Sequence, residues 1–121
     1  MDIYTEQIID LQKHPMNRGK MDGATASHSG VNVTCGDHVR IYVEIEEGRV
    51  KAASWEGDGC AISLAAASIL TDEVKGRTLE EALSLKNEDI FAWLGVSSLG
   101  PARVKCATLS LETLQGALKK L

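Results

Sequence analysis

The chain has 121 residues, of which 44% are hydrophobic and only 4% aromatic. This length suits one domain with one aliphatic core, and we expect a single domain over residues 1–121. The net charge of −4 argues against a nucleic-acid-binding face, and no apolar run approaches the roughly 20 residues of a membrane span. The first ten residues contain no lysine or arginine, unlike a signal peptide, so we expect a cytoplasmic protein.

The N-terminal part of the chain predicts a short helix and then a loop. Asp2 can cap an amphipathic helix, which ends before the proline at position 15. Residues 14–30 are rich in Gly, Ser, Asn and Asp and show no periodicity, so we predict a loop there. A short first strand is expected near Val31 and Val33.

Residues 38–46 carry the clearest strand pattern of the chain. Apolar and polar side chains alternate, with Val39, Ile41, Val43 and Ile45 on the face expected to be buried and His38, Arg40, Tyr42, Glu44 and Glu46 on the wet face. This period of two is typical of an antiparallel sheet with one face in water. Glu47-Gly48 predicts a hairpin turn, and residues 50–56 predict the returning strand.

The rest of the chain predicts helices. Residues 61–75 form a long helical pattern that Gly76 ends, and Thr78–Glu81 is a capping box for a short helix. Asn87 is expected to cap a further helix that ends at Gly95. A last helix carries a three-four apolar spacing on Val104, Ala107, Leu111, Leu114, Leu118 and Leu121. The order of elements predicts an α+β fold, a small antiparallel sheet of about three strands with helices packed on one side.

Each of the three cysteines of the chain lies beside a glycine or near the predicted start of a helix. Cys35 and Asp37 flank Gly36 before the predicted hairpin, and Cys60 follows the hairpin, so these residues are expected at the same end of the sheet. If Cys106 folds back to them, three thiolates and one carboxylate form a ligand set suited to zinc or to an iron–sulfur cluster. The alternative is that each cysteine is a buried small hydrophobe.

Three segments resemble the iron–sulfur cluster scaffold family of the IscU/SufU/NifU N-terminal type, namely Thr34–Asp37, Gly57–Ser63 and Ala102–Leu109. The resemblance extends over nearly the whole chain. It implies a scaffold that receives persulfide sulfur from a cysteine desulfurase, takes up iron, builds a [2Fe–2S] cluster and passes it to apo-proteins or carrier proteins. It also implies that the cluster, or zinc in the cluster-free form, is bound by Cys35, Asp37, Cys60 and Cys106.

The same resemblance assigns roles to single residues. Cys106 and Cys35 are the candidate acceptors of persulfide sulfur. Lys105 stands where IscU-like members have histidine, as in SufU-like members, and its ammonium group is expected to lower the pKa of Cys106 and support the reaction electrostatically. Two alternative functions stay open, a zinc-bound sulfurtransferase that assists a desulfurase and an interaction domain with structural zinc.

Two departures from the family limit the expected partners. The segment Leu99–Lys105 lacks the chaperone-binding motif of bacterial IscU, so an Hsp70-type chaperone is a doubtful partner. The spacing between Cys60 and Cys106 is too short for the insertion of SufU-like members. We expect a monomer or a weak homo-oligomer that binds neither nucleic acid nor membrane.

Overall fold

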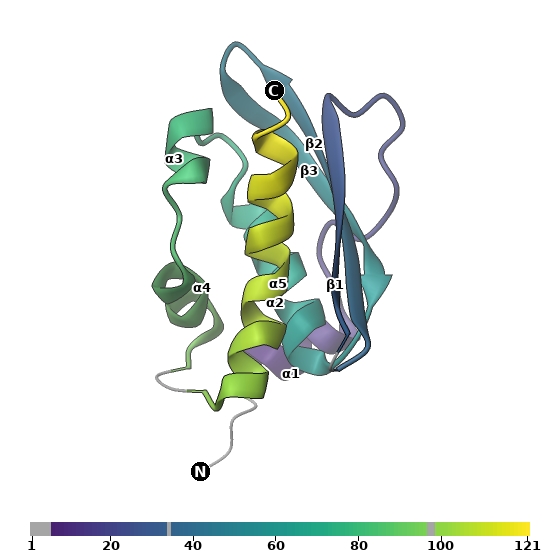
Figure 1. Cartoon of the computed structure of the whole chain (residues 1–121), viewed down its shortest axis with the longest axis vertical. Helices are drawn as coiled ribbons and strands as arrows, with labels where there is room; N and C mark the ends of the chain where they lie inside the picture. The colour runs from purple at the N-terminus through teal and green to yellow at the C-terminus, as the bar shows by residue number, and fades with distance from the viewer. Residues whose placement is uncertain (1–5, 34, 97–98) are drawn as a thin grey trace.

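The fold is α+β, as the order of elements predicts. The computed structural model describes residues 6–33, 35–96 and 99–121, so the expected cap Asp2 lies outside the described residues. The elements are α1 (Glu6–Lys13), β1 (Ala26–Asn32), β2 (Asp37–Glu46), β3 (Arg49–Asp58), α2 (Ala61–Glu73), α3 (Leu79–Leu83), α4 (Asn87–Leu94) and α5 (Pro101–Leu118). The three strands form one antiparallel sheet in the order β1-β2-β3 (Figure 1).

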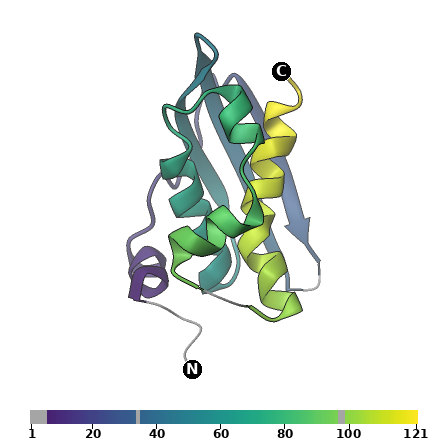
Figure 2. The ribbon, with the colours of Figure 1, turned by 90° about the vertical axis from the view of Figure 1, so that its left-hand side faces the viewer.

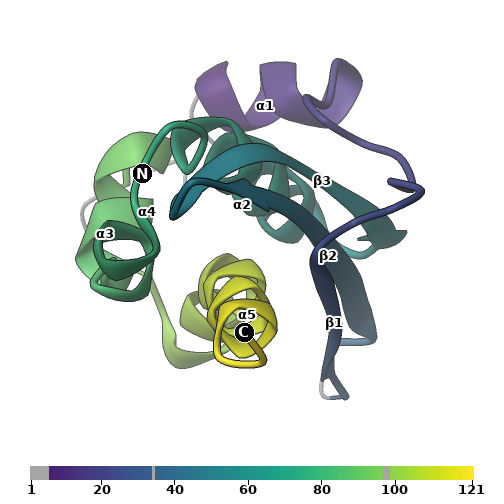
Figure 3. The same ribbon diagram turned by 90° about the horizontal axis from the view of Figure 1, so that it is seen from above.

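The helices are arranged in layers beside the sheet. Helix α5 packs against β1 and β2, and α2 packs against β3 and α5, as the view from above shows (Figure 3). Helix α1 contacts α2, and α3 and α4 lie outside α2 and α5 (Figure 2). The largest fully buried side chains fill the space between these layers; they include Ile8, Ile41, Trp55, Ile62, Leu70, Ile90, Leu94 and Leu114. None of the described helices combines the length and apolar character needed to cross a membrane.

The β2–β3 hairpin matches its prediction, with one difference. Glu47 and Gly48 both have positive φ, 54° and 75°, which is the turn geometry that suits the right-handed twist of a hairpin. Tyr42 was expected on the wet face, but only 6% of it is exposed. Its hydroxyl donates to the Glu56 carboxylate, and the Arg40 guanidinium lies over its ring at 5.6 Å. These two neighbours from the outer face of the sheet cover the ring.

Residues 14–30 are more ordered than the predicted loop. Residues 17–19 run along the outer edge of β3, where the Trp55 N–H donates to the Asn17 carbonyl (3.0 Å) and the Gly19 N–H donates to the Trp55 carbonyl (2.7 Å). The Trp55 indole also donates to the Met16 carbonyl (2.8 Å). The segment therefore pairs with backbone groups that an edge strand would otherwise expose.

Strand β1 begins at Ala26, earlier than the expected position near Val31 and Val33. Its inner face carries small or polar residues because α5 lies very close. A Cβ atom at Gly30 would overlap the Thr113 hydroxyl of α5. In the same way, a Cβ atom at Gly116 of α5 would overlap the His28 ring. The strand is set by backbone pairing with β2 and by close packing on α5, so it lacks the apolar alternation that identifies a strand.

Helix boundaries follow the predicted caps closely. Gly76 is left-handed (φ 86°) after α2, and Thr78 and Glu81 exchange both hydrogen bonds of a capping box. The cap of α4 is Lys86 rather than Asn87, because the Asp89 carboxylate accepts from the Lys86 N–H (2.9 Å). Gly95 ends α4 in the left-handed conformation.

Candidate metal centre

Three separate parts of the chain meet at one end of the sheet. Strand β2 starts at Asp37 and β3 ends at Asp58, and the pairing of His38 with Asp58 places these two ends side by side. The turn before β2 carries Cys35, and the junction between β3 and α2 carries Cys60. The first turns of α5 bring Cys106 to the same end, as the resemblance to the scaffold family implies.

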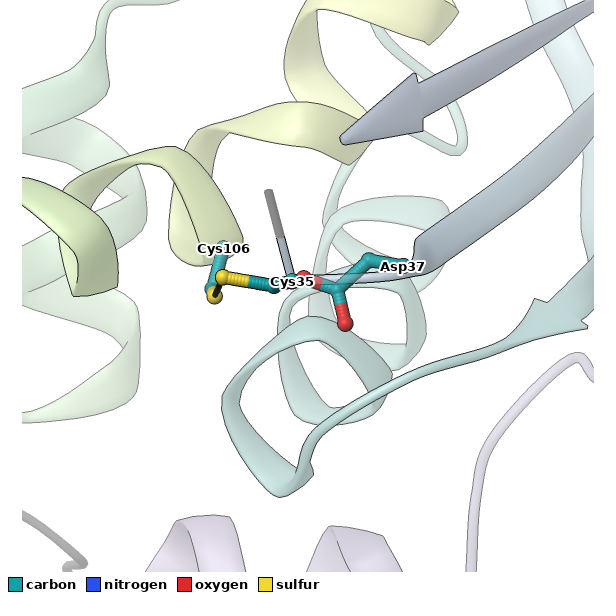
Figure 4. Close-up of side chains that lie close together, drawn as sticks. All are labelled: Cys35, Asp37 and Cys106. Carbon is teal, nitrogen blue, oxygen red and sulfur yellow. Dashed lines mark hydrogen bonds between the residues drawn. The ribbon is translucent and has the colours of Figure 1, made fainter. Parts of the chain in front are cut away.

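Cys35, Asp37 and Cys106 form the tightest group. Their potential ligand atoms all lie within 4.8 Å of one another, and the sulfur atoms of Cys35 and Cys106 are 3.6 Å apart (Figure 4). Two thiolates that share a tetrahedral zinc ion at about 2.3 Å are separated by about 3.8 Å. The two sulfur atoms therefore already have the spacing of ligands to one metal ion.

Cys60 lies beside this group and is joined to it by hydrogen bonds. Its N–H donates to Asp37 Oδ1 (3.0 Å), and its thiol donates to Ser63 Oγ (3.7 Å). The Cys60 thiol is also close enough to contribute to the raised pKa of Cys106. The structure thus brings all four predicted ligands together, with Cys60 at the margin of the tightest group.

Asp37 is the residue whose surroundings fit a cation best. It is fully buried, and its Oδ2 atom has no hydrogen-bond partner among the described residues. An unpartnered carboxylate oxygen away from water is costly, and a metal ion beside Cys35 and Cys106 would satisfy it. The donor set of three sulfur atoms and one carboxylate suits zinc or iron.

The pKa of Cys106 is raised well above the usual value for a thiol. Burial is the main cause, and the neighbouring Asp37, Cys60 and Cys35 raise it further. The expected effect of Lys105 on this pKa stays a prediction. Successive residues of a helix point about 100° apart, so the exposed Lys105 lines a groove of about 280 Å³ beside Val31 and Glu112.

Zinc affinity should therefore rise with pH. Cys106 is a neutral thiol near pH 7 because its pKa is raised, and a metal ion must displace its proton to bind the thiolate. Each displaced proton makes the apparent affinity change about tenfold per pH unit. We expect the zinc affinity, measured by chelator competition at pH 6, 7 and 8, to increase by at least this factor per unit. An affinity that is flat over this range would mean that zinc binding displaces no thiol proton.

Two residues of the site carry no metal-ligand signal in the sequence. Gly59 makes room for the Asp37 carboxylate, because a Cβ atom at Gly59 would lie 2.5 Å from Asp37 Oδ1. Ser63 bonds to both Cys60 and the main chain of Cys106. Asp58 is a turn residue as expected, since its carboxylate accepts from the Gly59 N–H (2.9 Å).

Gly59→Ala should weaken metal binding without unfolding the protein. The added methyl group must displace the Asp37 carboxylate, and changes to groups that support a ligand typically lower metal affinity about 10- to 100-fold. Gly100→Ala is the matched control, because a Cβ atom there meets nothing within 4 Å. The measurement is zinc affinity together with thermal unfolding of the metal-free protein. Equal zinc affinity for both variants would contradict the role of Gly59.

Residues 3–121 match the family model described as the NifU-like N terminal domain, and the chain belongs to this family. The resemblance inferred from the three cysteine segments is thereby confirmed.

Individual relatives have two different names. The chain is 38% identical to the iron–sulfur cluster assembly scaffold protein IscU of Thermotoga maritima, over 98% of this chain and 94% of the relative. It is 36% identical to the zinc-dependent sulfurtransferase SufU of Bacillus subtilis, over 98% and 90%. These alignments span 134 and 135 residues, more than the 121 residues of this chain, so each relative has residues in the aligned region that are missing here.

A solved structure supports the same relationship. The crystal structure of a putative scaffold protein for the SUF system from Fervidobacterium islandicum superimposes with a TM-score of 0.81 at 32% identity. The superposition covers 96% of each chain. The fold of the sheet and its helices is therefore that of a SUF-type scaffold protein.

Proposed function

We propose that this chain, as one domain over residues 1–121, is a scaffold on which [2Fe–2S] clusters are assembled and then passed to apo-proteins or carrier proteins. The observation that carries the proposal is the 3.6 Å separation of the Cys35 and Cys106 sulfur atoms beside the buried Asp37 carboxylate. The scaffold name of the Thermotoga relative supports it. Iron and persulfide sulfur are the substrates, and a cysteine desulfurase in the cytoplasm is the sulfur donor.

Sulfur transfer requires an accessible thiol on this chain. Cys35 is exposed, whereas Cys106 is buried, which favours Cys35 as the first acceptor and Cys106 as the second. The Cys35 thiolate attacks the terminal sulfur of the donor persulfide, the sulfur–sulfur bond breaks, and the donor cysteine leaves as a thiolate. A persulfide then remains on Cys35, within reach of Cys106 and of bound iron, and no external oxidant is consumed in this step.

A second candidate function uses the same residues without a cluster. Exposure of Cys35 also suits a protein that keeps zinc in the site and accepts sulfur from a desulfurase. The SufU relative, named a zinc-dependent sulfurtransferase, supports this alternative. Zinc would be held by Cys35, Asp37, Cys60 and Cys106, where it favours the thiolate forms of the cysteines.

Anaerobic reconstitution separates the two functions. The purified protein is incubated without oxygen with a cysteine desulfurase, cysteine, Fe²⁺ and a thiol reductant such as dithiothreitol, which supplies the electrons that turn persulfide sulfur into sulfide. Iron, acid-labile sulfide, zinc and the visible spectrum are then measured. A scaffold should acquire equal amounts of iron and sulfide with charge-transfer absorption, and should transfer both to an apo-ferredoxin. Retained zinc with a faster desulfurase and no cluster would select the sulfurtransferase instead.

A further inference from the structure

A single hydroxyl group links two of the cysteines that come from different helices. Ser63, in the first turn of α2, accepts a hydrogen bond from the Cys60 thiol at 3.7 Å. The same hydroxyl donates to the main-chain carbonyl oxygen of Cys106 on α5 at 3.3 Å. Ser63 therefore bridges the two helices at the point where both present a cysteine to the site.

The Ser63 hydroxyl bonds to a different helix, which is unusual for a serine at the start of a helix. Serine near the N-terminus of a helix commonly bonds to the unpaired N–H groups of its own helix. In α2 the cap position is Cys60, which makes no side-chain cap hydrogen bond, and its N–H is taken by the Asp37 carboxylate. Ser63 is left to bond across the helix interface to Cys106.

We propose that Ser63 is a positioning residue of the metal centre. This proposal rests on the proposed function, because it requires that the cysteines bind a metal ion. Ser63 holds Cys60 and the Cys106 main chain at a fixed separation. Its single hydroxyl proton donates to the Cys106 carbonyl in the metal-free site, and this proton can turn to the Cys60 sulfur once that sulfur is a metal ligand. A ligand sulfur has lost its proton and can only accept, and the Ser63 oxygen is already beside it. Such groups orient ligands and withdraw electron density from the sulfur.

The test uses cobalt and zinc rather than cluster assembly. Metal-free protein is titrated anaerobically with Co²⁺, and the sulfur-to-cobalt charge-transfer bands are recorded; zinc affinity is measured by chelator competition. In Ser63→Ala we expect these bands to move to lower energy, because the sulfur loses a hydrogen-bond donor. Zinc affinity should fall about 10- to 100-fold. Ser63→Thr keeps a hydroxyl and should restore the wild-type band positions.

The matched control is Ser68→Ala, which removes a buried hydroxyl from the same helix, where Ser68 Oγ accepts from the Met16 N–H (3.2 Å). It should leave the cobalt bands and the zinc affinity unchanged. Wild-type bands and affinity in Ser63→Ala, or an equal change in Ser68→Ala, overturn the role of Ser63. These titrations involve no desulfurase, so a failure of cluster assembly with intact cobalt binding would overturn the proposed function alone.

Discussion

Cys106→Ala should weaken zinc binding roughly 100- to 1,000-fold while leaving a folded protein. Cys106 contributes the sulfur atom 3.6 Å from Cys35 and within 4.8 Å of the Asp37 carboxylate. Four ligands to a structural zinc supply about 10–16 kcal/mol together, so an equal share for one ligand is about 2.5–4 kcal/mol. This is an affinity decrease of roughly 100- to 1,000-fold. Zinc content after dialysis and zinc affinity by competition measure it.

The folded state should survive this substitution because the core does not depend on the metal. Buried aliphatic side chains from the sheet and from α2, α4 and α5 form one continuous cluster, and a single small change in such a core costs about 1 kcal/mol. Ser110→Ala is the matched control. Ser110 lies one turn further along α5, is 2% exposed, and its hydroxyl has no partner among the described residues. If Cys106→Ala unfolds and Ser110→Ala does not, the metal is structural and the scaffold proposal is wrong.

The ends of the hairpin explain why most of the site could be predicted from the sequence. The alternation over residues 38–46 and the Glu47-Gly48 turn define the two strands, and two strands of a hairpin must start and finish at the same end. Cys35, Asp37 and Cys60 flank those ends, so their proximity follows from local patterns. Cys106 could be placed only by the family resemblance, because its distance from the hairpin depends on how three intervening helices pack.

The features that could not be predicted depend on close contacts between distant segments. Strand β1 has no apolar alternation in its sequence because it packs closely on α5. Gly30 lies against Thr113, and His28 lies against Gly116. The raised pKa of Cys106 results mainly from burial by the assembled fold, which its sequence neighbours do not reveal. The spacing of residues in the sequence indicates which of them share a helix or strand. How deeply a side chain such as that of Cys106 is buried depends on how the helices and strands pack.

We expect the Asp37 carboxylate, placed among three cysteine sulfur atoms, to promote release of a bound cluster. Three thiolates bind soft metal ions strongly, whereas a carboxylate is a harder ligand whose bond is more readily exchanged than that of a thiolate. Asp37 also adds a negative charge to a buried group of sulfur ligands, where like charges repel strongly. We therefore expect Asp37 to make a bound [2Fe–2S] cluster easier to release, although the same carboxylate is a ligand that strengthens the binding of a single zinc ion.

Asp37→Ala should give a cluster that persists several times longer and is transferred more slowly. The variant loses a negative charge and a weak ligand, but it also leaves the Cys60 N–H without its acceptor, which costs about 1–3 kcal/mol of stability. Asp37→Asn separates these effects, because its side-chain oxygen can still accept from Cys60 while the charge is gone. We expect both variants to slow transfer to an apo-ferredoxin, followed by circular dichroism, and only the alanine variant to lose thermal stability. If both variants lose their cluster faster than the wild type, Asp37 stabilises the cluster and does not promote its release.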